Sequence, residues 1–175
     1  MPEELLAPTD DDRRPVAGFF GKLPVTGDFV ARGLPEAFRR NWDAWLSRHI
    51  LPRQRESGLP PGGLRFRLVS GGRLAAGLIL PSTDSAGRLY PLSLILIAEG
   101  GLTQAQIDAW CDAALTLPVA TLAPDALWLA LDALPAPLPE GEATGPLQLW
   151  TPDQPPDPAG SGDPEDALNR LLSSG

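Results

Sequence analysis

Residues 64–98 read LRFRLVSGGRLAAGLILPSTDSAGRLYPLSLILIA and contain three apolar stretches joined by short connections. The first, Leu64 to Ser70, alternates apolar residues with Arg65 and Arg67, and this alternation predicts a strand in a sheet with one solvated face. The other two, residues 74–80 and 89–98, are more continuously apolar, as is typical of central strands covered on both faces. Because their connections are short, the three strands are expected to form an antiparallel meander.

The region before this meander contains the clearest helical pattern in the chain. Pro35 fits the first turn of a helix, where its missing N–H costs nothing. The residues that then share one helical face are Phe38, Trp42, Trp45, Leu46 and His49. Pro52 predicts that the helix ends or kinks near Leu51. Since this face is expected to be buried, a Trp45→Ala substitution should lower the free energy of unfolding by about 3–5 kcal/mol.

Weaker patterns complete the fold prediction. The further elements expected are a strand over Val16–Phe20, a loop over Gly21–Gly33, a helix capped by Thr103 and Gln106, a helix over Pro124–Leu134, a strand over Pro146–Thr151 and a short helix after Asp163-Pro164. This order predicts an α+β fold, with a mainly antiparallel sheet and helices packed on it in α/β/α-like layers. We expect residues 1–15 to form a disordered acidic tail, residues 16–151 a single domain, and residues 152–175 a Pro/Gly-rich linker with a short C-terminal helix.

The chain is acidic. Its 175 residues include 14 Lys and Arg against 22 Asp and Glu, a formal net charge of −8. This balance argues against nucleic acid as a partner and against docking on anionic lipid, because both need a concentrated basic surface. No apolar run approaches the roughly 20 residues of a membrane span, and the N-terminus lacks a signal-peptide pattern. With Cys111 as the only cysteine, no internal disulfide can form, and a cytoplasmic location is expected.

Motifs for catalysis, metal binding and cofactor binding are scarce. One histidine and one cysteine cannot make a His/Cys metal cluster. His49 lies on the aromatic helix face, where packing or capping is the expected role, and Cys111 lies beside Trp110 on another helix face, which favours a buried thiol. Gly21-Lys22 lacks the glycine spacing and the Ser/Thr of a phosphate-binding loop. We therefore predict no catalytic residue, no metal and no cofactor, and expect that the chain is not an enzyme.

Charged residues gather in two loops rich in glycine and proline. Lys22, Asp28 and Arg32 lie between the first strand and the first helix, whereas Asp84 and Arg88 lie between two central strands. Charges in such loops often orient a partner, so these residues are candidates for a binding surface. The structural alternative is that Asp28 or Asp84 caps its own turn and pairs with an arginine, which would tie the two loops together. A third reading, a catalytic acid or a small-ligand site, requires the side chains to converge on one pocket.

Both loops belong to longer segments that resemble one family. Residues 18–35 read GFFGKLPVTGDFVARGLP and lead into FRRNWDAWL at 38–46, while residues 81–94 read PSTDSAGRLYPLSL. In this order, the segments resemble the TagF (ImpM) family of proteins associated with the type VI secretion system. The matching positions, which are candidates for binding a partner or for locking the loops, are Lys22, Pro24, Gly27, Asp28, Arg32, Asp84, Gly87 and Arg88.

The resemblance implies a function by binding rather than by catalysis. It implies a cytoplasmic accessory protein of the bacterial type VI secretion system that represses the apparatus post-translationally. The partners it implies are secretion components, with a forkhead-associated scaffold protein as the specific candidate. The alternatives are a structural or assembly subunit of the apparatus, and a small anionic-ligand binder or hydrolase. Nucleic acid, membrane insertion and metal are not expected.

Overall fold

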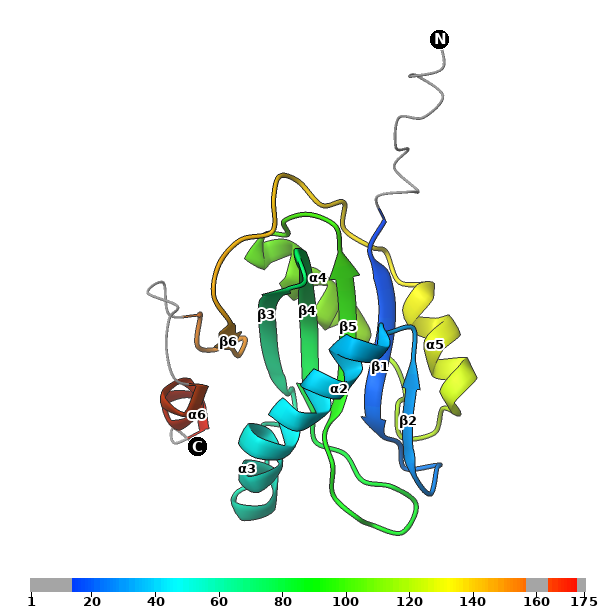
Figure 1. Ribbon diagram of the computed structural model, residues 1–175. Coiled ribbons are helices and arrows are strands. Elements are labelled where there is room, and N and C mark those ends of the chain that lie inside the picture. Colours follow the sequence, from blue (N-terminus) through cyan, green and yellow to red (C-terminus); the bar gives the residue numbers. More distant parts are fainter. Residues whose placement is uncertain (1–13, 157–163, 173–175) are drawn as a thin grey trace.

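A six-stranded antiparallel sheet forms the centre of the molecule (Figure 1). The computed structural model describes residues 14–156 and 164–172. The strand order is β2-β1-β5-β4-β3-β6, and every neighbouring pair is antiparallel. The strands are β1 (Val16–Lys22), β2 (Phe29–Arg32), β3 (Leu64–Ser70), β4 (Arg73–Leu80), β5 (Leu92–Ala98) and β6 (Gln148–Trp150). The predicted α+β class and the mainly antiparallel sheet are confirmed.

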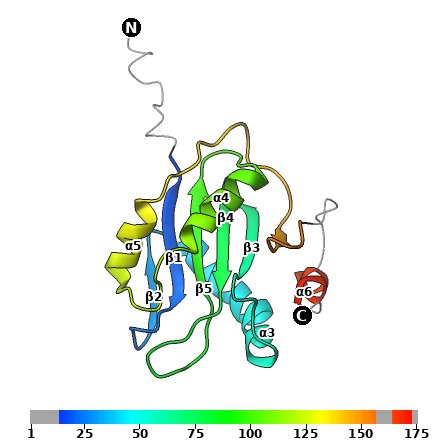
Figure 2. The same cartoon turned by 180° about the vertical axis from the view of Figure 1, so that it is seen from behind.

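Helices cover both faces of the sheet, as the two opposite views show (Figures 1 and 2). Their bounds are α2 (Glu36–Trp45), α3 (Leu51–Glu56), α4 (Gln104–Ala114), α5 (Pro124–Asp132) and α6 (Pro164–Leu172). α2 and α3 lie across one face, α4 and α5 lie on the other, and α6 packs near β6. Of the helices in the described part of the chain, none combines the length and the hydropathy that crossing a bilayer demands.

The predicted meander is present. β3 pairs with β4 along its whole length, and β4 pairs with β5 in the same way. Gly71 and Gly72 connect β3 to β4 with φ values of +60° and +78°, a backbone that tight hairpins use and that glycine adopts without strain. β5 begins at Leu92 rather than at Leu89, since Pro91 has no N–H to give to the ladder.

The segment predicted as a loop over residues 21–33 contains a strand, so that prediction is wrong. β1 extends to Lys22, and β2 pairs back on it with Lys22 opposite Phe29 and Phe19 opposite Arg32. β2 is short and lies at the edge of the sheet, where its side chains are only partly covered. The alternation of buried and exposed residues in β2 is therefore weak, and the glycines on either side of it are typical of a loop. Pairing with β1 stabilises the strand all the same.

The aromatic helix was predicted to end or kink near Leu51, and what lies there is an interruption of the regular α-helix and not an end of the helical segment. A π-helical turn over Leu46–Ile50, in which the Leu51 N–H binds the Leu46 carbonyl, connects α2 to α3. Pro52 stands in the first turn of α3, and the chain stays helical to Glu56. The π-helical turn shifts the hydrogen-bond pattern just before the proline, so the missing N–H breaks no regular bond.

Two apolar clusters attach the helices to the sheet, one on each face. Side chains of α4 and α5 pack against one set of alternate residues from β1, β4 and β5. The cluster on the other face includes Phe20, Phe38, Trp42, Leu46 and Phe66, and it also takes in two buried leucines of α6. The C-terminal helix is thus present and packed on the same sheet. The expected N-terminal tail up to residue 13 and the linker at 157–163 lie outside the described residues.

Two burial predictions are wrong. Trp45 is only half-buried, because it stacks on Trp42 with ring centroids 4.8 Å apart while Trp42 itself is 3% exposed. Arg65 was expected on a solvated face but is 2% exposed, with its guanidinium bonded to Asp108 at 2.7 Å and to Asp112. Burial lowers the pKa of Arg65, but the bonds to these two carboxylates outweigh burial and raise it. Two carboxylates of α4 thus neutralise the arginine that this helix buries.

Candidate functional site

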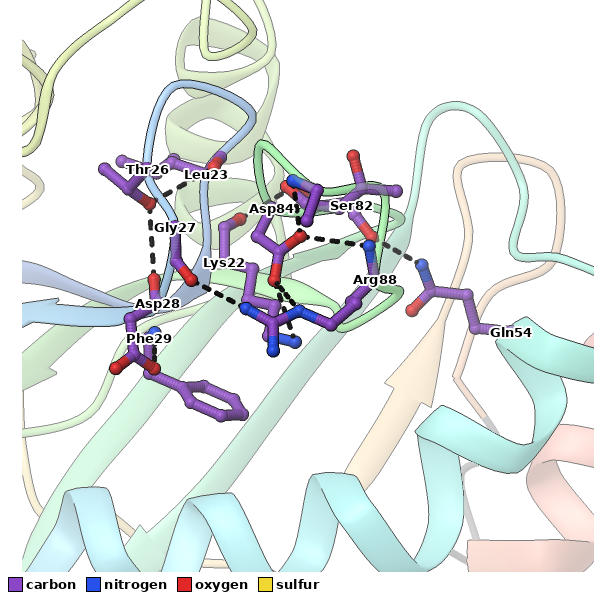
Figure 3. A network of polar contacts seen from close by, with 12 residues as sticks. Lys22, Leu23, Thr26, Gly27, Asp28, Phe29, Gln54, Ser82, Asp84 and Arg88 are labelled. Carbon is purple, nitrogen blue, oxygen red and sulfur yellow. Dashed lines mark hydrogen bonds and ion pairs between the residues drawn. The ribbon is translucent and has the colours of Figure 1, made fainter.

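The buried carboxylate of Asp84 lies where the two candidate loops meet (Figure 3). Its Oδ1 accepts hydrogen bonds from the backbone N–H groups of Ala86 at 2.9 Å and Arg88 at 3.0 Å. Its Oδ2 accepts a bond from Arg88 Nε at 2.7 Å and lies 3.3 Å from Lys22 Nζ. We call this group of Lys22, Asp84 and Arg88 the Asp84 node.

The Asp84 node keeps its carboxylate ionised. Burial of Asp84 acts to raise its pKa, but hydrogen bonds from the Arg88 backbone, Lys22 and the Ala86 backbone lower the pKa to about 2. Near neutral pH the group therefore holds no proton to donate, as a general acid must. All four lone-pair positions of the carboxylate have a donor or a cation, which suits it to holding two loops together.

Hydrogen bonds around the node tie the β1–β2 turn (residues 23–28) to the β4–β5 loop (residues 81–91). The Ser85 N–H donates to the Thr26 carbonyl at 2.7 Å, and Arg88 Nη2 donates to the Gly27 carbonyl at 2.7 Å. Arg88 thus reaches both the carboxylate of its own loop and the backbone of the other loop. The predicted tie between the two loops is present, with Asp84 as the residue that caps its own turn and pairs with an arginine.

Ser82 connects these loops to α3. Its Oγ donates to the Lys22 carbonyl at 2.7 Å, and its own carbonyl accepts a bond from Gln54 Nε2 at 2.9 Å (Figure 3). Neither Ser82 nor Gln54 is among the residues that sequence reasoning selected. Uncharged residues of this kind give little signal, because their partners lie far away in the sequence and become evident only in the folded chain.

The other predicted residues lie around the node or away from it. Gly87, with φ of +81°, donates its N–H to the Asp84 carbonyl at 3.0 Å, and Pro24 stands in the β1–β2 turn. Asp28 does not join the node: its carboxylate points away from Asp84 and accepts a bond from the Phe29 N–H at 2.7 Å (Figure 3). Arg32 pairs instead with Asp125 of α5, at 2.9 Å.

An aromatic cluster that the sequence did not indicate lies beside the node. The Phe29 ring stands edge-on to Tyr90 with centroids 4.8 Å apart and stacks on Phe20 at 6.0 Å. Lys22 Nζ lies 4.9 Å from the Phe29 ring centroid, within the range of a cation–π contact. The cluster was missed because Phe29 belongs to β2, the strand that was predicted as loop.

The tied loops also expose apolar side chains. Val25 and Phe29 are each 46% exposed, and Leu89 is 39% exposed. These three residues lie in or next to the β1–β2 turn and in the β4–β5 loop, and we call them the loop apolar residues. Of the three, Phe29 belongs to the aromatic residues that are enriched at protein–protein interfaces.

The remaining sequence candidates are accounted for by packing. His49 Nδ1 lies 2.8 Å from Glu165 Oε1, so the histidine links the π-helical turn to α6. Cys111 is buried, and burial raises the pKa of its thiol to about 12, which leaves it protonated and unreactive. Across residues 14–156 and 164–172, no three His, Cys, Asp or Glu side chains are grouped so that they could hold a metal ion.

Comparisons with known proteins agree with the family resemblance of residues 18–46 and 81–94. The family model of the TagF N-terminal domain, described as type VI secretion system-associated, matches residues 18–134. The fold is similar to the crystal structure of PA0076 from Pseudomonas aeruginosa PAO1, with a TM-score of 0.61 and 26% identity over 91% of this chain and 94% of that chain. No curated protein matches the sequence. Since the family model covers most of β1, all of β2 to β5, both candidate loops and the helices α2 to α5, the chain belongs to the TagF family and is a type VI secretion system-associated protein.

Proposed function

We propose that this protein is a cytoplasmic, post-translational negative regulator of the type VI secretion system that acts by binding another protein and not as an enzyme. The observation that carries the proposal is the Asp84 node. It uses Lys22 at the end of β1 together with Asp84 and Arg88 of the β4–β5 loop to fix the backbone of both loops. It leaves the loop apolar residues Val25, Phe29 and Leu89 at the surface.

The loop contacts support binding over catalysis. Asp84 is fully buried and saturated with donors, while Lys22 has 10% of its side chain exposed and points at the same carboxylate. A catalytic constellation would instead leave a nucleophile or a proton-transfer group facing a substrate cavity. The loops offer apolar contact area on a rigid support, which lowers the entropy lost when a partner docks.

The expected partner is a component of the secretion apparatus, with its forkhead-associated scaffold protein as the first candidate. Family membership supports a partner within this system. The same loops also expose charged residues, Arg88 with 63% of its side chain exposed and Asp28. A combination of apolar and charged side chains is found at many protein–protein interfaces.

Crosslinking mass spectrometry in an actively secreting strain tests the proposal. We expect crosslinks from the β1–β2 turn or the β4–β5 loop to one secretion component, lost when Val25 and Leu89 are both changed to aspartate. The matched control is Leu129→Asp on α5, because Leu129 is 71% exposed and lies away from both loops. Equal crosslinking by the wild type, the Val25→Asp/Leu89→Asp variant and the Leu129→Asp control would contradict a partner site on these loops.

A further inference from the structure

A groove runs beside α2 on the face of the sheet that α2 and α3 cover. It consists of two adjoining cavities of about 340 Å³ and about 130 Å³, and both are lined by Phe38 and Ser70. The larger cavity falls within the range of about 300–1,000 Å³ that ligand sites have. We call the two cavities together the α2 groove. None of the eight candidate loop residues lines either cavity.

An aromatic stack forms one wall of the α2 groove. Phe38 stacks on Trp42 with centroids 5.8 Å apart, and Trp42 stacks on Trp45 at 4.8 Å. Trp42 is held in place by its Nε1 hydrogen bond to Ser93 of β5, at 2.9 Å. The half-buried Trp45 lines the larger cavity on a support that is already ordered. A wall that is rigid before binding costs little entropy when a ligand arrives.

The opposite wall is an incomplete sheet edge. β6 pairs only with residues 65–67 of β3, so within the described chain Leu68, Val69 and Ser70 have a strand neighbour on the β4 side alone. These three residues and the segment 145–147 line the larger cavity. Apolar side chains therefore dominate both walls, and the groove suits a bulky apolar side chain.

Charge differs between the helical segment beside the groove and the later part of the chain. Residues 36–56 carry five arginines against three carboxylates, whereas residues 89–147 carry seven carboxylates and no lysine or arginine. Arg48, one helical turn beyond Trp45, is exposed and has no ion-pair partner among residues 14–156 and 164–172. Arg73 lines the smaller cavity at the other end of the groove, and its guanidinium also lies 3.8 Å from the exposed Glu99 carboxylate. Cations near both ends favour a ligand with carboxylates on both sides of its apolar anchor.

Polar groups at the rim complete the site. Asn41 is exposed and lines the larger cavity together with Ser70. The indole N–H of Trp45 has no acceptor among the described residues. A carboxylate or a peptide carbonyl of a bound ligand can accept a hydrogen bond from this N–H.

From these features we infer that the α2 groove binds an acidic segment of a partner protein through a leucine or phenylalanine side chain flanked by carboxylates. The inference rests on the proposed binding function and adds a second contact surface, distinct from the tied loops. We assign the occupant to another protein, since neither described end of this chain occupies the groove. α6 packs near β6, and Arg14 donates to the Asp132 carbonyl of α5, on the opposite face of the sheet.

Fluorescence anisotropy on the full chain tests the inference. The probe is a fluorescein-labelled peptide with two leucines between runs of aspartate. The control peptides have lysines for the aspartates or serines for the leucines. We expect the acidic leucine peptide to bind and both control peptides to bind at least about tenfold more weakly. Failure of the acidic leucine peptide to bind, or equal binding of all three peptides, would overturn the inference.

Matched variants locate the site. Asn41→Phe fills the larger cavity and should weaken binding of the acidic leucine peptide about tenfold, whereas Asn41→Ala leaves the cavity open and should not. Arg48→Glu should weaken binding several-fold, while Arg55→Glu, an equal charge change on exposed α3, should have no effect. If Arg48→Glu and Arg55→Glu weakened peptide binding equally, or if Asn41→Phe did not weaken it, the peptide would bind elsewhere and the inference of a site in the α2 groove would be refuted.

A further variant separates the partner from the protein's own N-terminus, whose sequence MPEELLAPTDDD has similar chemistry. Changing Leu5 and Leu6 to serine should leave the affinity for the acidic leucine peptide unchanged. A several-fold tighter affinity would show that the chain's own segment occupies the groove and would overturn the inference.

The regulatory function and the α2 groove can be refuted independently of each other. Repression of secretion by a protein that does not bind the peptide refutes the groove alone. Peptide binding by a protein whose deletion leaves secretion unchanged refutes the regulatory function alone.

Discussion

Lys22 Nζ lies 3.3 Å from the Asp84 carboxylate, and this ion pair joins the end of β1 to the β4–β5 loop inside the protein. Arg88 binds the same carboxylate from the solvent side and reaches the Gly27 carbonyl as well. A carboxylate buried without its cations would be strongly unfavourable, so each of these partners depends on the other two. The Asp84 node therefore determines how the β1–β2 turn is placed against the β4–β5 loop.

Replacing Asp84 with asparagine should destabilise the protein, because Lys22 then loses its counter-ion in a site where its side chain is only 10% exposed. We expect the midpoint of thermal unfolding to fall by several degrees. The control is Asp28→Asn, which removes the charge of an exposed carboxylate outside the node and should change stability by less than about 0.5 kcal/mol. Equal melting curves for Asp84→Asn and Asp28→Asn would refute the role of the node.

The stabilising effect of Asp84 should disappear in acid. Its pKa is lowered from 3.8 to about 2 in the folded chain, so its contribution is complete above the unfolded value and is lost as the pH falls through about 2. Urea unfolding of the wild type and Asp84→Asn should therefore show a constant difference in stability near neutral pH that shrinks below about pH 4. A difference that persisted unchanged to the lowest pH would mean that the carboxylate is not stabilised by its cations.

The two central tryptophans should differ in their contribution to stability. Trp42 is 3% exposed and donates to Ser93, so Trp42→Ala should cost about 3–5 kcal/mol. Trp45 is half-buried, and its ring contacts those of Trp42 and His49, so Trp45→Ala should cost about 1–2 kcal/mol. Chemical denaturation of both variants measures the difference, and equal losses would show that Trp45 belongs to the core after all.

Two glycines of the matching segments should tolerate alanine unequally. A Cβ at Gly21, where φ is +144°, would lie 2.2 Å from the Pro91 carbonyl oxygen, which is part of the backbone and cannot move aside. A Cβ at Gly87, where φ is +81°, would meet no atom within 4 Å. Gly87→Ala should therefore cost only the conformational strain of about 1–2 kcal/mol, and Gly21→Ala clearly more. Similar unfolding midpoints for the two variants would contradict the close approach of β1 to Pro91.

Hydrophobic periodicity accounts for the part of the fold that could be predicted. The meander of β3, β4 and β5 and the aromatic face of α2 consist of strongly apolar residues at regular spacing, and local sequence is informative there. β2 was missed because an edge strand of four residues owes its structure to its partner β1. The burial of Arg65 was missed because it depends on Asp108 and Asp112, which are brought to β3 only when α4 packs on the sheet.

In the candidate site, too, local contacts could be predicted from the sequence, whereas contacts between distant residues could not. Asp84 and Arg88 are four residues apart in one turn, and their pairing could be expected from spacing and turn chemistry. The pairing of Arg32 with Asp125 and the contact of Gln54 with Ser82 join residues distant in sequence, and a single sequence holds no signal for such contacts. The exposure of Val25, Phe29 and Leu89 likewise depends on how the two loops are tied.

The central claim, repression through a partner bound at the tied loops, is tested most directly by the amount of tube protein released by an actively secreting strain. Deleting the gene should raise this amount, the wild-type protein and Leu129→Asp should restore it, and the Val25→Asp/Leu89→Asp variant should not, although it is expressed and folded. Unchanged release after deletion would contradict repression. Full restoration by the double variant would contradict binding through the loop apolar residues.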